Sequence, residues 1–542
     1  MSAPVSSARD DTASPILMPV AQALVRPLWR RLLLSAGLGG LAGLAFAPVH
    51  AVPLLWLCFP GLVLLIDQAR TPRGVAATTG AFAFGHFCAS IFWVAESFSR
   101  QSSVPQALAP AAVLALALLL ALFYALPFGL ARRYAWPARR GDRLILMAGL
   151  WALAEWLRGH VFTGFPWNPL AAVWTVSDLT LQPLAYLGTW GLSLVTVWAA
   201  MAPAALLPPH RPRALMAGGT GLALLAIVMV GGAARLPAAD QPVHDDLVLR
   251  LVQPDIPQEQ KWQRSLRGRH FARHLAMSET SADIDGRFVV IWSESAVPYF
   301  LDQDPGRRQI IAGLLPDNGV LLTGQLRYSY ADSEDEDGRY YNALVAIGDE
   351  GGVLDVYDKA HLVPFGEYIP LHRQIERAVR WVVDDFDFSS FAYGRISMAA
   401  GPHLRTLDVA GLPPFSPLIC YEGIFPGQVV GRGVRPQWLL NVSNDAWFGD
   451  SWGPYQHFAL SRMRAVEEGV PLVRVAGRGI SAIIDPYGRI VRRTGLLERT
   501  TLTGGLPLPL KPPPAASISP GGAGLGLAIF VAFWAWRARR TT

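Results

Sequence analysis

Leu418-Ile419-Cys420-Tyr421-Glu422-Gly423 places a thiol at the end of an apolar run and a carboxylate two residues after it. The run Phe415 to Ile419 has the composition of a buried strand, and active sites gather at the strand ends of α/β sheets. The other two cysteines, Cys58 and Cys88, lie inside apolar runs, where small thiols pack. Cys420 is therefore the candidate nucleophile, and neither a disulfide framework nor a cysteine zinc site is expected.

Two further segments place charged side chains after apolar strands. Glu294 follows the run Phe288 to Trp292, and Lys359 begins the string Lys359 to Glu367, which reads KAHLVPFGE. A thiol with an ordinary pKa is mostly protonated at neutral pH, so catalysis needs a base and a cation beside it. Glu294 is the candidate base and Lys359 the candidate oxyanion-stabilising cation, with the main-chain N–H of Tyr421 as a second donor. Each residue alone also has a structural explanation, as strand filler or as half of an ion pair.

A block of ordinary polarity between residues 245 and 508 contains apolar runs with the composition of buried strands. Gln456 to Glu468 has apolar residues at near-helical spacing, and the turn Asp485-Pro486-Tyr487-Gly488 predicts a hairpin. We therefore expect an α/β sandwich in this block. The expected strands are Leu247 to Val252, Phe288 to Trp292, Gly319 to Thr323, Ala343 to Ile347, Phe415 to Ile419, Trp438 to Val442, Leu472 to Val475 and Ile480 to Ile484.

The rest of the chain is too apolar for a soluble enzyme, since the whole sequence is 51% hydrophobic and 16% charged. Several stretches are long enough to cross about 30 Å of hydrocarbon. We expect a polytopic α-helical membrane domain of about eight spans plus an extramembrane catalytic domain, with boundaries at 1–240, 241–510 and 511–542. The expected spans lie near residues 31–48, 51–67, 76–96, 108–131, 143–157, 178–207, 214–234 and 518–536.

Arginine clusters flank these stretches and predict the topology. If eight spans alternate, the clusters near residues 26–31, 70–73, 132–143, 211–213 and 537–540 all fall on one side. By the positive-inside rule that side is cytoplasmic, and the polar block faces outward. The same placement argues against nucleic acid as a partner despite a net charge of +6. The first stretch alone could also be a cleavable signal peptide, although further spans follow it.

The order Glu294, Lys359, Cys420, with the flanking residues, resembles the nitrilase (carbon–nitrogen hydrolase) superfamily, whose members use a Glu-Lys-Cys triad on an αββα sandwich. The string at Lys359, the CYE at Cys420 and the NDAWFG of residues 444–449, together with the expected spans, look like the apolipoprotein N-acyltransferase family. The resemblance implies that further residues support the active site: Trp262, Glu367, Tyr421, Glu422 and Trp447.

Two places depart from that family's pattern. Ser293 stands where the family usually has proline before the glutamate, and Gly477-Arg478-Gly479 stands where it typically has Asn-rich residues. Neither touches the triad, so the departures put the local loop shape in doubt rather than the reaction class.

The resemblance also implies a reaction and a location. A phospholipid acyl donor would transfer its acyl chain through a Cys420 thioester to the α-amino group of a diacylglyceryl lipoprotein acceptor, by ping-pong kinetics and without cofactor or metal. The enzyme would be a multi-pass protein of the bacterial inner (cytoplasmic) membrane, with its catalytic domain on the periplasmic side.

Two other functions use the same observations differently. A membrane-anchored nitrilase-type amidase would use the triad on a small carbon–nitrogen substrate with water as acceptor. A transporter or receptor would need ionisable residues along its spans, and few occur beyond Glu96 and Glu155.

Two segments outside the motifs also carry expectations. The aromatic segment Trp381 to Tyr393 is a candidate lid that touches lipid, or else an ordinary loop. The acidic run from Asp332 to Asp337 is expected to be a solvated loop rather than a calcium site, because Ala343 stands at the twelfth position from Asp332.

Overall fold

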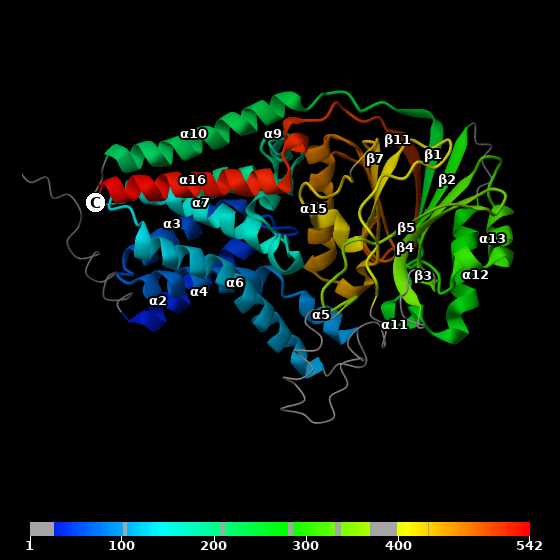
Figure 1. Ribbon diagram of the computed structural model, residues 1–542, viewed down its shortest axis with the longest axis horizontal. Coiled ribbons are helices and arrows are strands. Elements are labelled where there is room, and N and C mark those ends of the chain that lie inside the picture. The colour runs from blue at the N-terminus through cyan, green and yellow to red at the C-terminus, as the bar shows by residue number, and fades with distance from the viewer. Residues whose placement is uncertain are drawn as a thin grey trace, which may run out of the picture.

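The computed structural model describes residues 27–100, 106–207, 212–279, 286–330, 338–368, 398–431 and 433–541. A bundle of long helices lies on one side, and a β-sandwich with its covering helices lies on the other (Figure 1). The candidate lid at residues 381–393 and the acidic run at residues 332–337 lie outside the described residues.

Each predicted apolar stretch contains one long helix, but only some of these helices are long and apolar enough to cross a membrane. Four helical segments of the described residues meet that criterion: Gln106–Tyr134, Leu184–Leu206, Pro212–Arg235 and Pro520–Arg540. These four segments indicate a membrane domain. The other bundle helices are shorter or more polar, so the predicted number of eight spans is not established. The bundle helices are α2 (Leu28–Gly43), α3 (Leu55–Asp67), α4 (Pro72–Ser90), α6 (Ala109–Tyr134), α7 (Arg140–Arg158), α9 (Leu184–Ala200), α10 (Pro212–Arg235) and α16 (Pro520–Thr541).

In the described residues, two sheets form the block of ordinary polarity. The first has six strands in the order β11-β1-β2-β3-β4-β5, and the second has five in the order β10-β9-β8-β7-β6. Strands β1, β2 and β3 pair in parallel, as do β6, β7 and β8. The strands are β1 (Val243–Gln253), β2 (Arg287–Trp292), β3 (Val320–Ser329), β4 (Arg339–Gly348), β5 (Val353–Asp358), β6 (Phe415–Ile419), β7 (Trp438–Ser443), β8 (Leu472–Ala476), β9 (Ala482–Ile484), β10 (Ile490–Arg493) and β11 (Thr500–Pro507).

The two sheets pack face to face, and helices cover their outer faces. In β2, Val289 and Ile291 point into the core between the sheets, whereas Phe288, Val290 and Trp292 pack on the other side. Both faces of the strand are thus buried, which explains its unbroken apolar sequence. Helices α12 (Arg267–Ser278) and α13 (Pro305–Ala312) cover the first sheet, and α15 (Trp452–Glu468) covers the second (Figure 1). The expected αββα sandwich is confirmed.

Helix α15 is also the joint between the sandwich and the membrane bundle. Its Phe458 and Ala465 pack on the second sheet, whereas Leu460, Met463 and Val466 belong to the hydrophobic core of the membrane bundle. The helix was predicted from its apolar spacing, and the structure adds that its charged residues are buried as well. A helix enclosed on all sides must give every one of these charges a partner.

Two side chains of α15 make most of the polar contacts with the bundle. Gln456 Oε1 accepts hydrogen bonds from Trp93 Nε1 at 3.0 Å, Trp167 Nε1 at 2.9 Å and Asn168 Nδ2 at 3.0 Å. Glu467 Oε1 accepts from the backbone N–H of Thr189 at 2.7 Å and from its hydroxyl at 2.6 Å. These bonds fix the orientation of the sandwich on the bundle.

Replacement of Gln456 by alanine tests this joint. The change leaves three buried N–H donors without their acceptor, at about 1–3 kcal/mol each. We expect Gln456→Ala to unfold at a clearly lower temperature in detergent, with a loss of at least about 2 kcal/mol of stability. The exposed Gln437 supplies the control. Equal unfolding temperatures for Gln456→Ala and Gln437→Ala would contradict the assignment.

Candidate active site

The three predicted catalytic residues follow the carboxyl ends of three strands. Glu294 follows β2 and Lys359 follows β5 in the first sheet, and Cys420 follows β6 in the second. Because the sheets face each other, these ends converge at one edge of the sandwich. The exposed fractions of Glu294, Lys359 and Cys420 are 4%, 1% and 8%. The structure therefore brings the predicted triad together in a site nearly closed to solvent.

A fourth predicted residue, Glu367, completes the charge cluster. Lys359 Nζ lies 2.9 Å from Glu367 Oε2, 3.0 Å from Glu367 Oε1 and 3.8 Å from Glu294 Oε1. Asn342 Nδ2 donates to Glu294 Oε1 at 2.7 Å and to Glu367 Oε1 at 2.8 Å. Burial acts against the ammonium, but Glu367 and Glu294 raise the pKa of Lys359 above its ordinary value. Lys359 therefore stays charged, with its ammonium held at a fixed position between two carboxylates.

Cys420 occupies a strained position at the start of the 3-10 turn Cys420–Ile424, with a φ of 53°. Such a conformation in a non-glycine residue is often found at functional sites. Ser443 Oγ lies 3.5 Å from the thiol sulfur. Burial, and then the charge of Glu294, raises the pKa of the Cys420 thiol, whereas Lys359 and Ser443 lower it. The raised pKa favours the thiol form of Cys420 over the thiolate.

Glu422 fastens the loop that carries Lys359 to the turn that carries Cys420. Its Oε1 accepts from the backbone N–H groups of Ala360 at 2.9 Å and His361 at 3.0 Å, and from Tyr357 Oη at 2.8 Å. Its Oε2 accepts from the backbone N–H of Ile419 at 2.8 Å. Burial raises the pKa of Glu422, although Lys359 and these donors oppose the shift. A single carboxylate therefore sets the spacing of the loop that carries Lys359 and the turn that carries Cys420.

Tyr421 connects the turn that carries Cys420 to the membrane domain. Its hydroxyl donates to the backbone carbonyl of Gly164, in the loop after α7, at 2.9 Å. Its ring packs against Phe425 and His361. The residue next to the nucleophile is thus held by a membrane-domain loop.

A buried polar network contacts the main chain of Cys420 through His457. Arg474 Nη2 lies 2.8 Å from Asp445 Oδ2, and His457 Nδ1 lies 2.9 Å from Asp445 Oδ1. His457 Nε2 lies 3.2 Å from the carbonyl oxygen of Cys420. Although burial acts in the opposite direction, Arg474 and His457 hold the pKa of Asp445 below its usual range. The network keeps the strained main chain of Cys420 in place.

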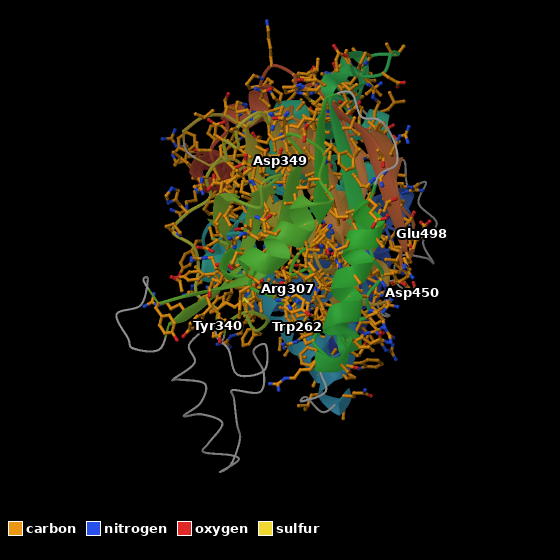
Figure 2. The ribbon with its side chains drawn as sticks, turned by 90° about the vertical axis from the view of Figure 1, so that its right-hand side faces the viewer. Trp262, Arg307, Tyr340, Asp349, Asp450 and Glu498 are labelled. Carbon is orange, nitrogen blue, oxygen red and sulfur yellow. The ribbon has the colours of Figure 1, made fainter. Side chains whose placement is uncertain are left out.

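The two predicted tryptophans lie on segments that border the site. Trp262 follows helix α11 (Gln258–Lys261) and lies at the lower edge of the sandwich in Figure 2. Its indole N–H is buried and has no hydrogen-bond partner among the described residues. Trp447 lies in the 3-10 turn Asp445–Phe448, and its carbonyl accepts from Ser97 Oγ at 3.2 Å. Neither tryptophan is placed on the charge cluster itself, and their supporting roles stay predictions.

The two departures from the family pattern lie against each other. A Cβ atom on Gly477 would come within 2.8 Å of Ser293 Oγ, which is closer than normal contact. The neighbouring Arg478 forms an ion pair with Asp255, with 3.0 Å between Nε and Oδ1. Ser293 and the glycine after β8, Gly477, therefore fit as a pair.

Several residues of the site were not found from the sequence. Asn342 is a lone amide just before the apolar run of β4, and its place beside that run was the signal that the sequence offered. The structure shows that it is buried, where an amide needs hydrogen-bond partners. Ser443, Asp445 and His457 lie within or close to the quoted NDAWFG string. Ser443 and His457 contact Cys420, and Asp445 bonds to both of them, but this arrangement arises only when β6 and β7 pair. Among the described residues, no group of three or more His, Cys, Asp or Glu is placed to hold a metal ion.

Comparison with known proteins matches both halves of the chain. Residues 38–202 match the family model described as apolipoprotein N-acyltransferase N-terminal domain, and residues 249–510 match that of carbon-nitrogen hydrolase. Among solved structures, the nitrilase-superfamily protein Nit3 of Saccharomyces cerevisiae aligns at 18% identity and a TM-score of 0.33, covering 50% of this chain and 93% of its own.

Curated relatives cover nearly the whole chain. The apolipoprotein N-acyltransferase of Rhodopseudomonas palustris is 38% identical over 89% of this chain and 91% of its own. Those of Bradyrhizobium diazoefficiens, at 38% identity, and Brucella melitensis, at 37%, each cover 89% of this chain, with 90% and 91% of their own lengths. The sandwich, its membrane bundle and these full-length relatives lead to one conclusion: the chain belongs to the apolipoprotein N-acyltransferase family.

Proposed function

We propose that this protein is a phospholipid-dependent N-acyltransferase that acylates the α-amino group of the N-terminal diacylglyceryl cysteine of apolipoproteins. One observation carries the proposal: a closed Glu294, Lys359 and Cys420 cluster lies on a nitrilase-like sandwich that is locked onto a membrane bundle. The full-length likeness to apolipoprotein N-acyltransferases supports the same reaction.

In the first half-reaction, Glu294 takes the proton of the Cys420 thiol as the sulfur attacks the ester carbonyl of the phospholipid. Lys359 and the backbone N–H of Tyr421 stabilise the tetrahedral oxyanion. When the intermediate collapses, the ester C–O bond breaks and the departing lysophospholipid oxygen receives the proton from Glu294. The acyl chain remains on Cys420 as a thioester.

In the second half-reaction, the neutral α-amino group of the lipoprotein attacks the thioester carbonyl. Glu294 accepts the proton of the attacking amine, and Lys359 again holds the oxyanion. Collapse breaks the C–S bond, forms the amide and returns the proton to Cys420. The two substrates use one site in turn, which gives ping-pong kinetics.

We also propose the predicted topology of eight spans, with the sandwich on the periplasmic side of the inner membrane and domains at 1–240, 241–510 and 511–542. Arginine-bearing segments meet at the bundle end that lies far from the sandwich (Figure 1). Arg539 Nε donates to Tyr134 O at 2.9 Å, and Arg132 Nη2 donates to Arg70 O at 3.0 Å. Positive charge at this end supports a cytoplasmic location for it.

Removal of the nucleophile tests the proposed reaction most directly. Purified protein in phospholipid without acceptor is expected to gain one long-chain acyl group on Cys420, visible by intact and peptide mass spectrometry. Cys420→Ala is expected to carry no acyl group and to form no N-acylated lipopeptide, whereas Cys58→Ala behaves as wild type because Cys58 only packs in the bundle. Small acyl adducts alone would instead favour the amidase.

Removal of the cation or the base tests the rest of the triad. We expect Lys359→Met to lower the rate of thioester formation by about 10²–10³-fold, because an oxyanion donor is lost. Glu294→Gln loses the proton acceptor and is expected to fall by about 10²–10⁴-fold. The exposed Glu350→Gln serves as the control. Wild-type rates in either triad variant would remove that residue from the mechanism.

A further inference from the structure

Lysine is rare in this chain, and its distribution is informative. Of the 47 lysines and arginines, three are lysines: Lys261, Lys359 and Lys511. Lys511 is exposed, whereas Lys359 belongs to the proposed triad and Lys261 is 6% exposed. Lysine differs from arginine in that its pKa shifts readily when it is buried, which suits a catalytic environment. Both buried lysines of this arginine-rich chain lie at the candidate active site.

The contacts of Lys261 place it directly behind the catalytic glutamate. Its Nζ donates to the backbone carbonyl of Glu294 at 3.0 Å. Its helix α11 is fixed against the loop after β7, because Gln258 Oε1 accepts from Asn444 Nδ2 at 2.9 Å. Among the described residues, no carboxylate forms an ion pair with Lys261. A buried ammonium with a single carbonyl acceptor is unfavourable by itself, so its charge requires another explanation.

The charge balance of the site supplies that explanation. Lys359 is shared between Glu367 and Glu294, so its positive charge is already compensated before Cys420 ionises. Burial and Glu294 both oppose a thiolate at Cys420. The negative charges of Glu294 and Cys420 in turn favour the ammonium of Lys261. A second cation beside this cluster makes the proton transfer from the thiol easier.

We propose that Lys261 is a positioning residue of the catalytic centre: its ammonium holds the main chain of Glu294 and supplies the second positive charge that stabilises the Cys420 thiolate. This inference rests on the proposed function, in which Cys420 attacks the phospholipid. Lys261 touches no reacting atom and acts through the glutamate and through its charge.

The pH dependence of this effect has a definite sign. Burial lowers the pKa of Lys261 to about 8, although Glu294 and Cys420 oppose the shift. The charge is therefore present below that pH and is lost as the pH rises through it. The other titratable groups that face Lys261 are His270 and His274 of α12, and burial lowers the pKa of both, to about 4 for His274. Both histidines are neutral near pH 8, so Lys261 sets the alkaline limit.

Thioester formation without acceptor is the appropriate measurement, because the acceptor amine would itself titrate near pH 8. The rate of long-chain acylation of Cys420 is followed by mass spectrometry from pH 6 to 9.5 in phosphatidylglycerol-containing micelles. The wild-type rate is expected to fall above about pH 8. Lys261→Met and Lys261→Gln are expected to be slower by about 10–100-fold at pH 7, without that alkaline fall.

Two comparisons separate charge from hydrogen bonding and packing. Lys261→Gln keeps a donor for the Glu294 carbonyl but has no charge, whereas Lys261→Arg keeps the charge at all accessible pH values. Lys261→Arg is expected to retain more activity than Lys261→Gln and to show no fall above pH 8. Lys511→Arg is the matched control, because Lys511 is exposed, and it should behave as wild type. Thermal unfolding of each variant identifies any that fails to fold.

A second readout does not depend on acyl transfer. The rate at which iodoacetamide alkylates Cys420, measured on its peptide, reports the thiolate fraction. Alkylation is expected to be slower in Lys261→Gln than in wild type below about pH 8, and the two rates are expected to converge above it, where Lys261 itself loses its charge. If Lys261→Gln acylates and alkylates as wild type does, the inference is wrong and the triad stands. If wild type forms no thioester, the proposed function fails, and the alkylation profile still decides whether Lys261 controls the charge on Cys420.

Discussion

The enclosure of α15 between the second sheet and the membrane bundle is the constraint on which the rest of the structure depends. A helix buried on every side can contain Gln456 and Glu467 only if neighbouring groups satisfy them, and those groups come from the bundle. Any rotation of the sandwich on the bundle would leave buried indole, amide and carboxylate groups unpaired. The interface therefore has one favourable arrangement, and the edge of the sandwich that carries Cys420 has one position relative to the membrane domain.

The loop that carries Lys359 and the turn that carries Cys420 are likewise held in place by hydrogen bonds of buried polar side chains. Glu422 joins the Lys359 loop to the Cys420 turn through four donors, and Tyr421 joins that turn to Gly164 of the membrane domain. The two residues that follow Cys420 thus have different partners: Tyr421 bonds to the membrane domain, and Glu422 bonds to the loop that carries Lys359. This arrangement holds a positive φ at Cys420 that an isolated loop would relax.

Much of this architecture follows from local sequence, and the exceptions have physical reasons. Each of the eight predicted runs overlaps a strand because both faces of those strands are covered, which selects unbroken apolar residues. Gly319 lies before β3, and Ile480 and Ser481 lie before β9. Strand β5 is an edge strand with exposed positions, and β11 contains two glycines among threonines, so neither carried an apolar signal. The apolar stretches located the bundle helices, but α2 and α3 are shorter than a full span and α7 begins with charged residues, so the number of crossings does not follow from the helices alone.

Some residues of the site were predicted from sequence motifs, and others reach it only through strand pairing and helix packing. Glu294, Lys359, Cys420 and Glu367 come together as the strings indicated, because each string ends a strand at one edge of the sandwich. Asn342 lies in no quoted motif, and Lys261 lies in the Gln260-Lys261-Trp262 segment, of which only Trp262 was predicted to support the site. The contacts of Asn342 with the glutamates depend on the pairing of β3 with β4, and the contact of Lys261 depends on the packing of α11 against the loop after β7. Both bring together residues that are far apart in the sequence.

A nitrilase-type triad by itself does not decide between water and an amine as acyl acceptor, since Glu294 can take a proton from either. The difference lies in access. With Glu294, Lys359 and Cys420 all less than a tenth exposed, few water molecules can reach a thioester on Cys420. In the proposed reaction, the acyl chain and the diacylglyceryl anchor of the acceptor are held by the membrane, so the amine arrives at high local concentration. The proposed acyl transfer therefore rests on where the sandwich holds Cys420 relative to the membrane bundle.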